Sequence, residues 1–479
     1  MRVPFVFFFL AALVSPGWGD YVTKPLPKSF GVWEGWGTSL AWWGKAFGDR
    51  DDLADAFFTL HSTVTINKTF SVPGLGLNIV RYNAGATSSK PAGGSTMVRS
   101  PHVKDSRLVE AFWLTWEGDE STQWDWSRDR NQRMSLRKAA DRGANLLQLF
   151  SNSPVWWMCD NHNPSGSPSG VTDNLQTWNR RNHTKYLANI VHKFRTMYNI
   201  TFNSVEPFNE PNSNWWKSDG TQEGCHFSPA TQAPVLAYMR QELDEFGLYE
   251  VDIAASDENS YSLAISTWND FDAATKSKVD QVNVHGYEYG SGRRDILYNI
   301  TQGKRLWNSE YGEGDASGMS LATNLNLDFK WLHPTAWVYW QAVDGSTWGL
   351  LSGNEDAAPW PTLATTPNNK YFVLAQYTRH IRPGMTIIDG GSDKNTVAAW
   401  DHEASRLVLV TTNYGTPQRV KYDLSQIYRG KCPKEAQRWS TTGDSKKQYA
   451  EEPNVVVSET CEVDIIVSTN EVTTLELQP

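Results

Sequence analysis

Two glutamates at the ends of short apolar segments are the residues of this chain best suited to chemistry. Glu210 lies in the segment VEPFNEP (205–211), and Glu310 lies in LWNSEYG (306–312). Two carboxyl groups can break a glycosidic bond, because one protonates the leaving oxygen while the other faces the anomeric carbon of a cation-like transition state. The sequence therefore predicts Glu210 as the acid/base and Glu310 as the nucleophile of such a reaction.

Two neighbouring acids are alternatives for these roles. Glu206 has the same strand parity as Glu210, but it lies four residues earlier and so deeper below the strand end. Glu313 follows Glu310 within a glycine-rich loop. A solvated loop glutamate without a catalytic role is the remaining interpretation of Glu210.

Several polar residues end other apolar segments and are expected near the two acids. Arg81 carries a permanent charge that is costly inside a protein unless it is paired, so we expect it to hold Glu310 ionised; a surface salt bridge is the alternative. Asn209 is expected to donate to the sugar hydroxyl beside the anomeric carbon, or else to cap a turn. His285 and Tyr287 are expected to bind substrate or to orient Glu310, although a strand-end histidine is often only structural.

Tryptophan is abundant, with 23 residues and 13% aromatic side chains. A core can be filled by aliphatic residues, so a surplus of indoles indicates exposed aromatic surfaces, on which the apolar faces of sugar rings stack. Trp156, which follows the third predicted strand, and Trp340, which ends the eighth, are the expected stacking platforms. For Trp157 a place in the core is equally expected.

From about residue 75 to 380, short apolar segments alternate with amphipathic ones, which is typical of repeated βα units. Eight strands are expected, over 31–35, 76–82, 145–150, 202–208, 251–255, 281–285, 305–309 and 336–340. Helices are expected over 183–198 and 233–246, where apolar residues recur with the helical period. This predicts a (β/α)8 TIM barrel, with Glu210 after the fourth strand and Glu310 ending the seventh, on opposite sides of its mouth.

A doubly wound open sheet is the alternative architecture. Its dinucleotide fingerprint is matched most nearly by GLGLNI (74–79), which lacks the third glycine and leads into a strand. The long loops 84–100 and 160–174 follow predicted barrel strands, so we expect them to shape the active-site face.

After residue 382 the sequence changes to short β-branched segments. They are expected to form antiparallel strands over 406–410, 454–458, 463–467 and 472–477. We therefore expect a catalytic barrel over 31–382 and a C-terminal β-sandwich over 383–479.

The N-terminus indicates a secreted protein. Residues 1–19 combine Arg2, an apolar segment and small residues, which is typical of a cleavable signal peptide. No later segment approaches the roughly 18 apolar residues of a membrane span. Secretion would expose the chain to N-glycosylation. Four sequons for this modification begin at Asn67, Asn182, Asn199 and Asn299.

Four cysteines in an oxidising compartment predict two structural disulfides. The sequence leaves three pairings open. We expect Cys159 to pair with Cys225, which would join two loops, and Cys432 with Cys461, which would staple the C-terminal domain.

Other chemistries and partners are disfavoured. The formal charge of −9 argues against a nucleic acid partner. Neither a zinc-binding His-Glu-x-x-His, nor paired Cys-x-x-Cys spacing, nor a Gly-x-Ser-x-Gly elbow occurs, so we expect no metal or cofactor and no serine hydrolase. A monomer that binds polysaccharide, with no membrane partner, is expected.

With these residues in view, the chain resembles glycoside hydrolase family 30, most closely its fungal endo-β-1,6-galactanases. The resemblance covers essentially the whole mature chain. It rests on EGWGTSLAWW (34–43), RYNAG (81–85), FSNSPVWWM (150–158), PFNEP (207–211), HGY (285–287) and NSE (308–310).

The resemblance implies a barrel with a side β-sandwich to which the segment 20–30 also contributes. It further implies a retaining mechanism with Glu210 as acid/base and Glu310 as nucleophile, acting on β-1,6-linked galactan. The Gly-Phe-Gly-Gly of other family branches reads GWGT here (35–38), so their specificities do not carry over. A β-1,6-glucanase or a glucuronoxylanase of the same family is the alternative, and a non-catalytic sugar-binding protein is the alternative from another class.

Overall fold

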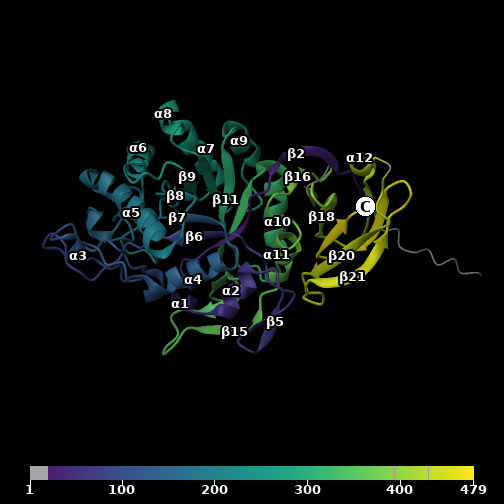
Figure 1. Cartoon of the computed structure of the whole chain (residues 1–479), viewed down its shortest axis with the longest axis horizontal. Coiled ribbons are helices and arrows are strands. Elements are labelled where there is room, and N and C mark those ends of the chain that lie inside the picture. Colours follow the sequence, from purple (N-terminus) through teal and green to yellow (C-terminus); the bar gives the residue numbers. More distant parts are fainter. Residues whose placement is uncertain (1–19, 392–394, 430) are drawn as a thin grey trace, which may run out of the picture.

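The computed structural model describes residues 20–391, 395–429 and 431–479. The predicted signal peptide (1–19) therefore lies outside the described residues. Figure 1 shows a helix-surrounded barrel with a β-sandwich at one side.

Eight parallel strands close into a barrel in the order β10-β11-β12-β3-β6-β7-β8-β9. Their bounds are β3 (Gly35–Ser39), β6 (Ile79–Asn83), β7 (Leu146–Phe150), β8 (Ser204–Glu206), β9 (Asp252–Glu258), β10 (Gln281–His285), β11 (Arg305–Tyr311) and β12 (Ala336–Gln341). Parallel barrel strands are covered on both faces, which explains why every residue of β3, β6, β8 and β10 is buried, polar residues included. The predicted (β/α)8 fold is confirmed.

The helices form the outer layer of the barrel. Their bounds are α1 (Trp43–Phe47), α2 (Asp51–Phe58), α3 (Glu120–Gln123), α4 (Arg130–Asp141), α5 (Arg180–Tyr198), α6 (Pro229–Glu245), α7 (Tyr261–Asp270), α8 (Ala273–Lys276), α9 (Arg294–Ile300), α10 (Met319–Leu327) and α11 (Lys370–Thr378), with α12 (Ser425–Tyr428) in the sandwich. α5 buries Leu187, Ile190 and Phe194 on one face, as the helical period predicts. Both predicted helices begin slightly earlier than expected; α6 starts at Pro229, a residue suited to a first turn.

The prediction of the first barrel strand over 31–35 is wrong. Residues Leu26–Val32 form β2 of the sandwich, and the barrel strand is β3 (Gly35–Ser39). β3 passes close to its neighbours: a Cβ on Gly35 would lie 1.9 Å from Asn78 Oδ1, and one on Gly37 would lie 2.7 Å from Ile79. Small residues are required there, so this strand lacks the β-branched signal that marks the others.

The sandwich packs a seven-stranded sheet, β2-β16-β17-β18-β23-β20-β21, against a three-stranded sheet, β1-β19-β22. Its further strands are β1 (Asp20–Thr23), β16 (Thr386–Asp389), β17 (Thr396–Asp401), β18 (Arg406–Asn413), β19 (Gln418–Asp423), β20 (Glu435–Thr442), β21 (Ala450–Val456), β22 (Glu462–Val467) and β23 (Glu471–Leu477). Inward-facing residues such as Leu409, Val463 and Leu475 fill the space between the sheets. The predicted C-terminal strands are confirmed, with shifted ends.

Two small sheets decorate the barrel. One pairs β4 (Val64–Ile66) with β5 (Phe70–Val72). The other follows β12 and consists of β13 (Val343–Asp344), β14 (Leu351–Asn354) and β15 (Thr362–Pro367). The second sheet matters for function, because it follows a barrel strand at the active-site end.

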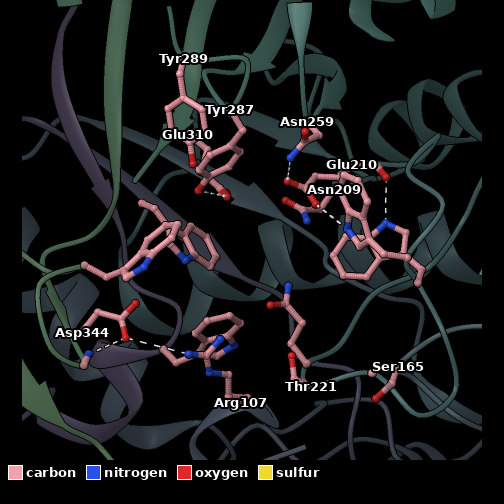
Figure 2. Close-up of a pocket in the computed structure, with 18 residues that line it drawn as sticks. Arg107, Ser165, Asn209, Glu210, Thr221, Asn259, Tyr287, Tyr289, Glu310 and Asp344 are labelled. Carbon is pink, nitrogen blue, oxygen red and sulfur yellow. Dashed lines mark hydrogen bonds and ion pairs between the residues drawn. The ribbon is translucent and has the colours of Figure 1, made fainter. Parts of the chain in front are cut away.

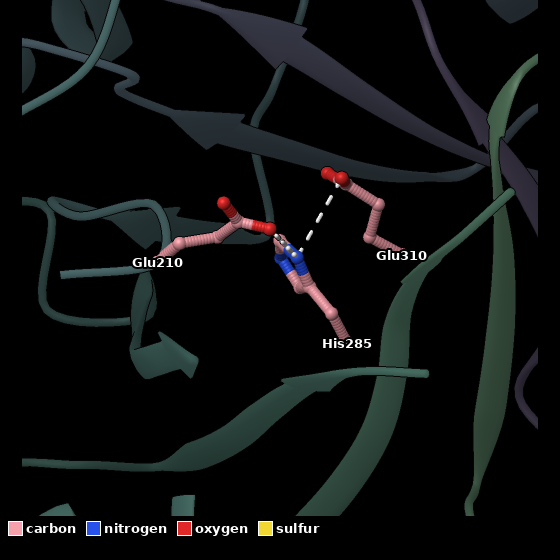
Figure 3. A group of neighbouring side chains, drawn as sticks. All are labelled: Glu210, His285 and Glu310. Atoms are coloured by element: carbon pink, nitrogen blue, oxygen red, sulfur yellow. Dashed lines mark hydrogen bonds and ion pairs between the residues drawn. The ribbon is translucent and has the colours of Figure 1, made fainter. Parts of the chain in front are cut away.

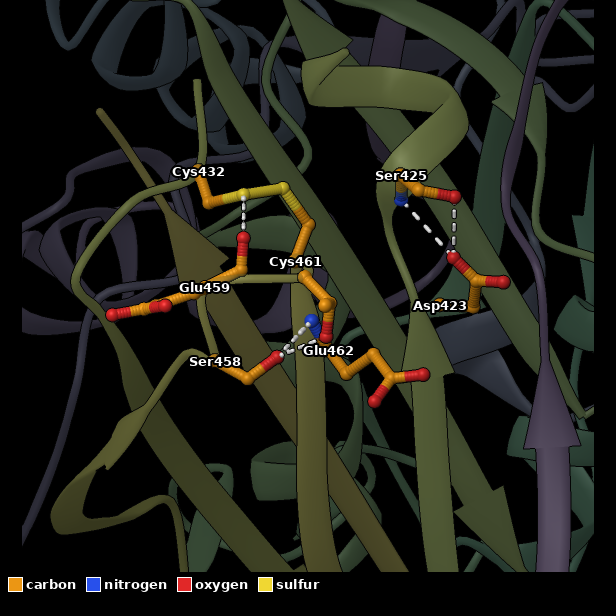
Figure 4. The surroundings of a disulfide bond; sticks show 8 residues. Asp423, Ser425, Cys432, Ser458, Glu459, Cys461 and Glu462 are labelled. Carbon is orange, nitrogen blue, oxygen red and sulfur yellow. Dashed lines mark hydrogen bonds between the residues drawn. A yellow bond between two sulfur atoms is a disulfide. The ribbon is translucent and has the colours of Figure 1, made fainter. Parts of the chain in front are cut away.

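One of the two predicted disulfides is present. Cys432 and Cys461 are bonded, with Cα atoms 5.2 Å apart, and staple the segment after α12 to the turn before β22 (Figure 4). The predicted pair Cys159–Cys225 is wrong: both side chains are buried free thiols. Each thiol is directed at a backbone carbonyl, Cys159 at Pro154 (3.7 Å) and Cys225 at His226 (3.4 Å), which satisfies it without a partner sulfur.

Candidate active site

The two glutamates singled out by the sequence meet at the mouth of the barrel. Glu210 lies in the loop after β8, and Glu310 lies near the end of β11. Both are nearly buried, at 7% and 4% exposure. One oxygen of each carboxylate and a nitrogen of His285 all lie within 4.8 Å of one another (Figure 3). The barrel thus brings together two acids that are separated by a hundred residues.

Three side chains hold the carboxylate of Glu210. Asn259 Nδ2 donates to Oε1 at 2.8 Å, and Trp215 Nε1 donates to Oε2 at 3.2 Å (Figure 2). His285 Nδ1 lies 3.1 Å from Oε1. Trp216 Nε1 donates to the backbone carbonyl of Glu210 at 2.8 Å. Each carboxylate oxygen therefore has a fixed donor, and the group is oriented before any substrate arrives.

Glu310 is held by a phenol and a guanidinium. Tyr287 donates to Oε1 at 3.0 Å, and Arg81 Nη1 donates to Oε2 at 3.2 Å. Burial raises the pKa of Glu310 to about 7, against the opposing effect of the positive charges of His285 and Arg81. Arg81 therefore contacts Glu310 as the sequence analysis expected, and it favours the ionised carboxylate.

His285 and Arg81 form a buried layer below the two glutamates. Burial alone would lower the pKa of His285, but the carboxylates of Glu310 and Asp257 raise it well above its usual value. Asp257 lies 3.2 Å from His285 Nε2 and also pairs with Arg81. Burial would raise the pKa of Asp257, yet Arg81 and His285 hold it at about 2. The layer thus alternates positive and negative charges, which a buried network requires.

The alternative acids do not face the substrate space. Glu206 is fully buried inside the barrel, and neither of its carboxylate oxygens has a hydrogen-bond partner among the described residues. Burial, followed by the charge of Asp257, raises the pKa of Glu206 well above its usual value, which favours the neutral form. Glu313 pairs with Lys370 at 2.8 Å. Neither residue lines the cavity above Glu210 and Glu310.

A cavity of about 740 Å³ lies above the two glutamates, and we call it the active-site cavity (Figure 2). Its aromatic lining consists of Trp42, Trp215, Trp216, Tyr287, Tyr289, Trp340 and Trp348. Asn209 also lines it, and its buried Oδ1 has no partner among the described residues. An unpaired buried acceptor is costly, so Asn209 is poised to bind a hydroxyl of a ligand in this cavity.

The structure changes the expected contacts of three residues. Trp156 lies in the core at 0% exposure and does not line the cavity, so the prediction of a stacking platform there is wrong. Its segment turns inward as the 3-10 helix Trp156–Met158, where Trp157 packs against Trp113. Arg81 and His285 are also fully buried and outside the cavity lining. They touch the glutamates and not the substrate space.

Sequence reasoning missed several residues of the cavity. Trp42 lies edge-on to Trp340 at 5.2 Å between ring centroids, and the guanidinium of Arg107 stacks 3.9 Å from the ring of Trp42. Trp215 and Trp348 are 43% and 40% exposed. The sequence did offer a signal for Trp215: it is next to Trp216, and this pair follows Glu210 by only a few residues. Arg107 lies in the short 3-10 helix Asp105–Arg107, which has no such sequence signal.

The chemistry of the site is that of proton transfer and carboxylate attack. Glu210, His285 and Glu310 lie close enough to hold a metal ion. However, a metal needs a neutral imidazole, and the carboxylates around His285 raise its pKa, which favours the protonated ring and disfavours metal binding. Carboxyl groups that are about 5 to 5.5 Å apart are typical of retaining glycosidases, whereas inverting enzymes hold them about 6.5 to 9.5 Å apart.

The (β/α)8 barrel, the paired acids and the tryptophan-lined cavity define a glycosidase. A protein-family sequence model described as "O-Glycosyl hydrolase family 30" matches residues 22–283 of this chain. An endo-β-1,6-galactanase of Hypocrea rufa is 53% identical over 427 residues, covering 88% of this chain and 87% of that protein. The chain belongs to glycoside hydrolase family 30.

Solved structures share the fold at low identity. A conserved exported protein from Bacteroides fragilis aligns with a TM-score of 0.74 and 16% identity, over 95% of this chain and 100% of that one. A family 30 subfamily 8 xylanase from Clostridium acetobutylicum aligns with a TM-score of 0.68 and 17% identity, over 96% and 100%. Both cover the barrel together with the sandwich, since nearly the whole chain is matched.

Proposed function

We propose that this protein is a retaining endo-β-1,6-galactanase in which Glu210 is the acid/base and Glu310 is the nucleophile. The observation that supports the mechanism is that one carboxylate oxygen of Glu210 and one of Glu310 lie within 4.8 Å of each other, a short separation that favours direct attack by Glu310 over a water held between Glu310 and the anomeric carbon. The observation that carries the substrate is the 53% identity to the Hypocrea rufa endo-β-1,6-galactanase over most of both chains.

In the first step, Glu310 attacks the anomeric carbon while Glu210 gives its proton to the leaving glycosidic oxygen. The bond between that carbon and oxygen breaks, and a covalent glycosyl ester of Glu310 forms. Before attack, Tyr287 and Arg81 stabilise the negative charge on Glu310 through their hydrogen bonds. Asn209 binds the hydroxyl beside the anomeric carbon, where its unpaired Oδ1 accepts.

In the second step, Glu210 has become a carboxylate and acts as the base. It takes a proton from a water that attacks the anomeric carbon, and the ester bond to Glu310 breaks. Two inversions give net retention of configuration. The donors on both oxygens of Glu210, Asn259 and Trp215, keep the group in place while it changes charge.

Trp340 and Trp348 provide the stacking surfaces of the active-site cavity, whereas Arg107 already covers the ring of Trp42. Aromatic faces favour sugar rings in general, so they do not separate galactan from β-1,6-glucan or glucuronoxylan. A panel of these polysaccharides with sizing of the products tests the proposal. We expect oligosaccharides of several sizes early in the digestion of β-1,6-galactan only. If reducing ends were released only from another of these polysaccharides, the proposed substrate would be wrong. Binding without any release of reducing ends would favour a non-catalytic sugar-binding protein.

We further propose that the protein is secreted as a glycosylated monomer. Asn67, Asn199 and Asn299 are exposed, as glycan attachment requires; Asn182 is half-buried and donates to Asn179. The disulfide fits an oxidising compartment. In the described part of the chain, no helix has both the length and the apolar character that spanning a bilayer demands. N-terminal sequencing and glycan release on protein from culture medium test this, and a mature N-terminus far from residue 20 would contradict it.

We also propose bounds for the two structural units of the chain, the catalytic barrel and the β-sandwich. Residues 31–382 are proposed as the catalytic unit, and residues 383–479 together with 20–30 as the supporting sandwich. The pairing of β1 with β19 and of β2 with β16 supports this, because both N-terminal strands lie in the sandwich sheets. Limited proteolysis that released residues 383–479 as a separately folded fragment would contradict it, since two of its strands come from the N-terminus.

A further inference from the structure

We propose that a second cavity, in series with the active-site cavity, binds a distal part of the same polysaccharide chain. This second cavity, the distal groove, has a volume of about 830 Å³. Its walls come from α1, the loop 99–106 and the connection between β14 and β15. Figure 1 shows α1 and β15 at the same edge of the barrel. The inference rests on the proposed function, since its ligand is the galactan cleaved at Glu310.

A smaller hollow of about 330 Å³ adjoins both the distal groove and the active-site cavity, with which it shares lining residues. The hollow shares Arg107, Asp344 and Gly345 with the active-site cavity. It shares Ser106 and Glu355, among others, with the distal groove. The three spaces therefore run in series, and a chain that extends beyond the active-site cavity past Arg107 enters the distal groove.

The charges of the distal groove favour an uncharged ligand. Its lining holds four basic and four acidic side chains. Several of them neutralise one another: Arg99 pairs with Asp105 at 2.7 Å, and Lys104 lies 4.0 Å from Asp356. A polyanion or polycation would meet as much repulsion as attraction. A neutral chain rich in hydroxyl groups, by contrast, finds both donors and acceptors.

Two features give the groove the chemistry of a sugar site. Trp360 is 77% exposed and presents its indole to the groove, where a pyranose ring can stack. Glu355 Oε1 is buried and has no hydrogen-bond partner among the described residues, so it can accept from a sugar hydroxyl. The connection that carries both residues is anchored, because Ser106 donates through N and Oγ to the two oxygens of Asp356, each at 2.9 Å.

This arrangement predicts that long chains are bound better than short ones, and that Trp360 contributes to the difference. The test compares wild type with Trp360→Ala on β-1,6-galactan and on a short β-1,6-galacto-oligosaccharide that fits the active-site cavity alone. We expect KM for the polymer to rise about five-fold, a typical loss for one aromatic stack, with the oligosaccharide kinetics unchanged. Glu355→Gln should give a smaller rise of the same kind.

Trp331→Ala is the matched control, because Trp331 is 47% exposed and does not line the described cavities. It should leave both substrates unaffected. Unchanged polymer kinetics in Trp360→Ala would overturn the inference, as would an equal loss on both substrates, which would indicate damage to the active site itself. If the wild type fails to cleave β-1,6-galactan at all, the proposed function fails instead, so the two failures are distinguishable.

Discussion

Tyr287 donates its hydroxyl hydrogen to Oε1 of Glu310 at 3.0 Å, from the loop after the neighbouring barrel strand. The phenol also lines the active-site cavity. It therefore contacts the proposed nucleophile and the substrate space at once. A donor to a carboxylate stabilises its charged form and lowers its pKa, so Tyr287 favours the state of Glu310 that can attack.

Replacing Tyr287 with Phe should shift the acidic limb of the pH–activity profile to higher pH. Glu310 must be ionised, so activity is lost as the pH falls through its pKa. Burial already raises that pKa to about 7, and loss of the donor raises it further. We expect kcat at the optimum to fall about ten-fold and the acidic limb of kcat/KM to shift to higher pH. Tyr289→Phe, another phenol of the cavity, should leave the limb in place; an unshifted limb in Tyr287→Phe would refute the assigned role.

Replacing Glu310 with Ala should reduce hydrolysis by about 10⁴-fold or more, since an enzyme without its nucleophile retains little chemistry. Azide fits the space left by the side chain, so its addition should restore turnover of an activated galactoside and yield a glycosyl azide of inverted configuration. The anomeric configuration of this product is read by NMR. Glu206→Gln is the control: Glu206 lies outside the active-site cavity, and its raised pKa favours the neutral form that Gln resembles, so activity close to wild type is expected. Full activity in Glu310→Ala would contradict the mechanism.

Replacing Trp215 with Phe separates stacking from hydrogen bonding. The variant keeps an aromatic ring but loses the donor to Glu210 Oε2. We expect kcat to fall about three- to ten-fold, the range for one such hydrogen bond, with little change in KM. Trp348→Phe is the comparison, because Trp348 lines the same cavity at similar exposure and should affect KM more than kcat. The reverse pattern would show that Trp215 serves only as a platform.

Removing the disulfide should destabilise the protein without touching the chemistry. Cys432 and Cys461 are 29 residues apart, and a loop of that length corresponds to about 3 to 4 kcal/mol in the chain-entropy account. Cys432→Ser/Cys461→Ser should therefore lower the Tm by several degrees while kcat/KM stays the same. Thiol titration of the denatured wild type should detect the two free cysteines, Cys159 and Cys225; no reactive thiol would contradict this pairing.

The strand-end positions of the two glutamates were predictable, because a barrel places its chemistry where buried strands meet loops. Glu210 and Glu310 each follow an apolar segment, and the structure brings them together. The (β/α)8 fold was predictable because short apolar segments alternate with amphipathic ones over most of the barrel. β3 was misplaced because close packing demands glycine there and removes that signal.

The residues that line the cavity were harder to predict, because loop geometry decides which face a side chain presents. Trp156 follows β7 and Trp340 lies at the end of β12, yet Trp156 turns into the core and Trp340 lines the cavity. Arg107 comes from the short 3-10 helix Asp105–Arg107 and Trp348 from a loop, and neither segment has a periodic apolar pattern. The cysteine pairing depends likewise on loop paths: Cys159 and Cys225 lie in irregular segments whose thiols are directed at backbone carbonyls.

The central claim is that Glu310 forms a covalent bond to the sugar. It is tested most directly by incubating the enzyme with an activated 2-deoxy-2-fluoro-galactoside, whose second step is slow, and locating the label by peptide mass spectrometry. We predict one fluorogalactosyl group per chain, on the peptide that contains Glu310, and its release when an acceptor sugar is added. A label on Glu210 or another residue, or hydrolysis with inversion and no label, would contradict the account.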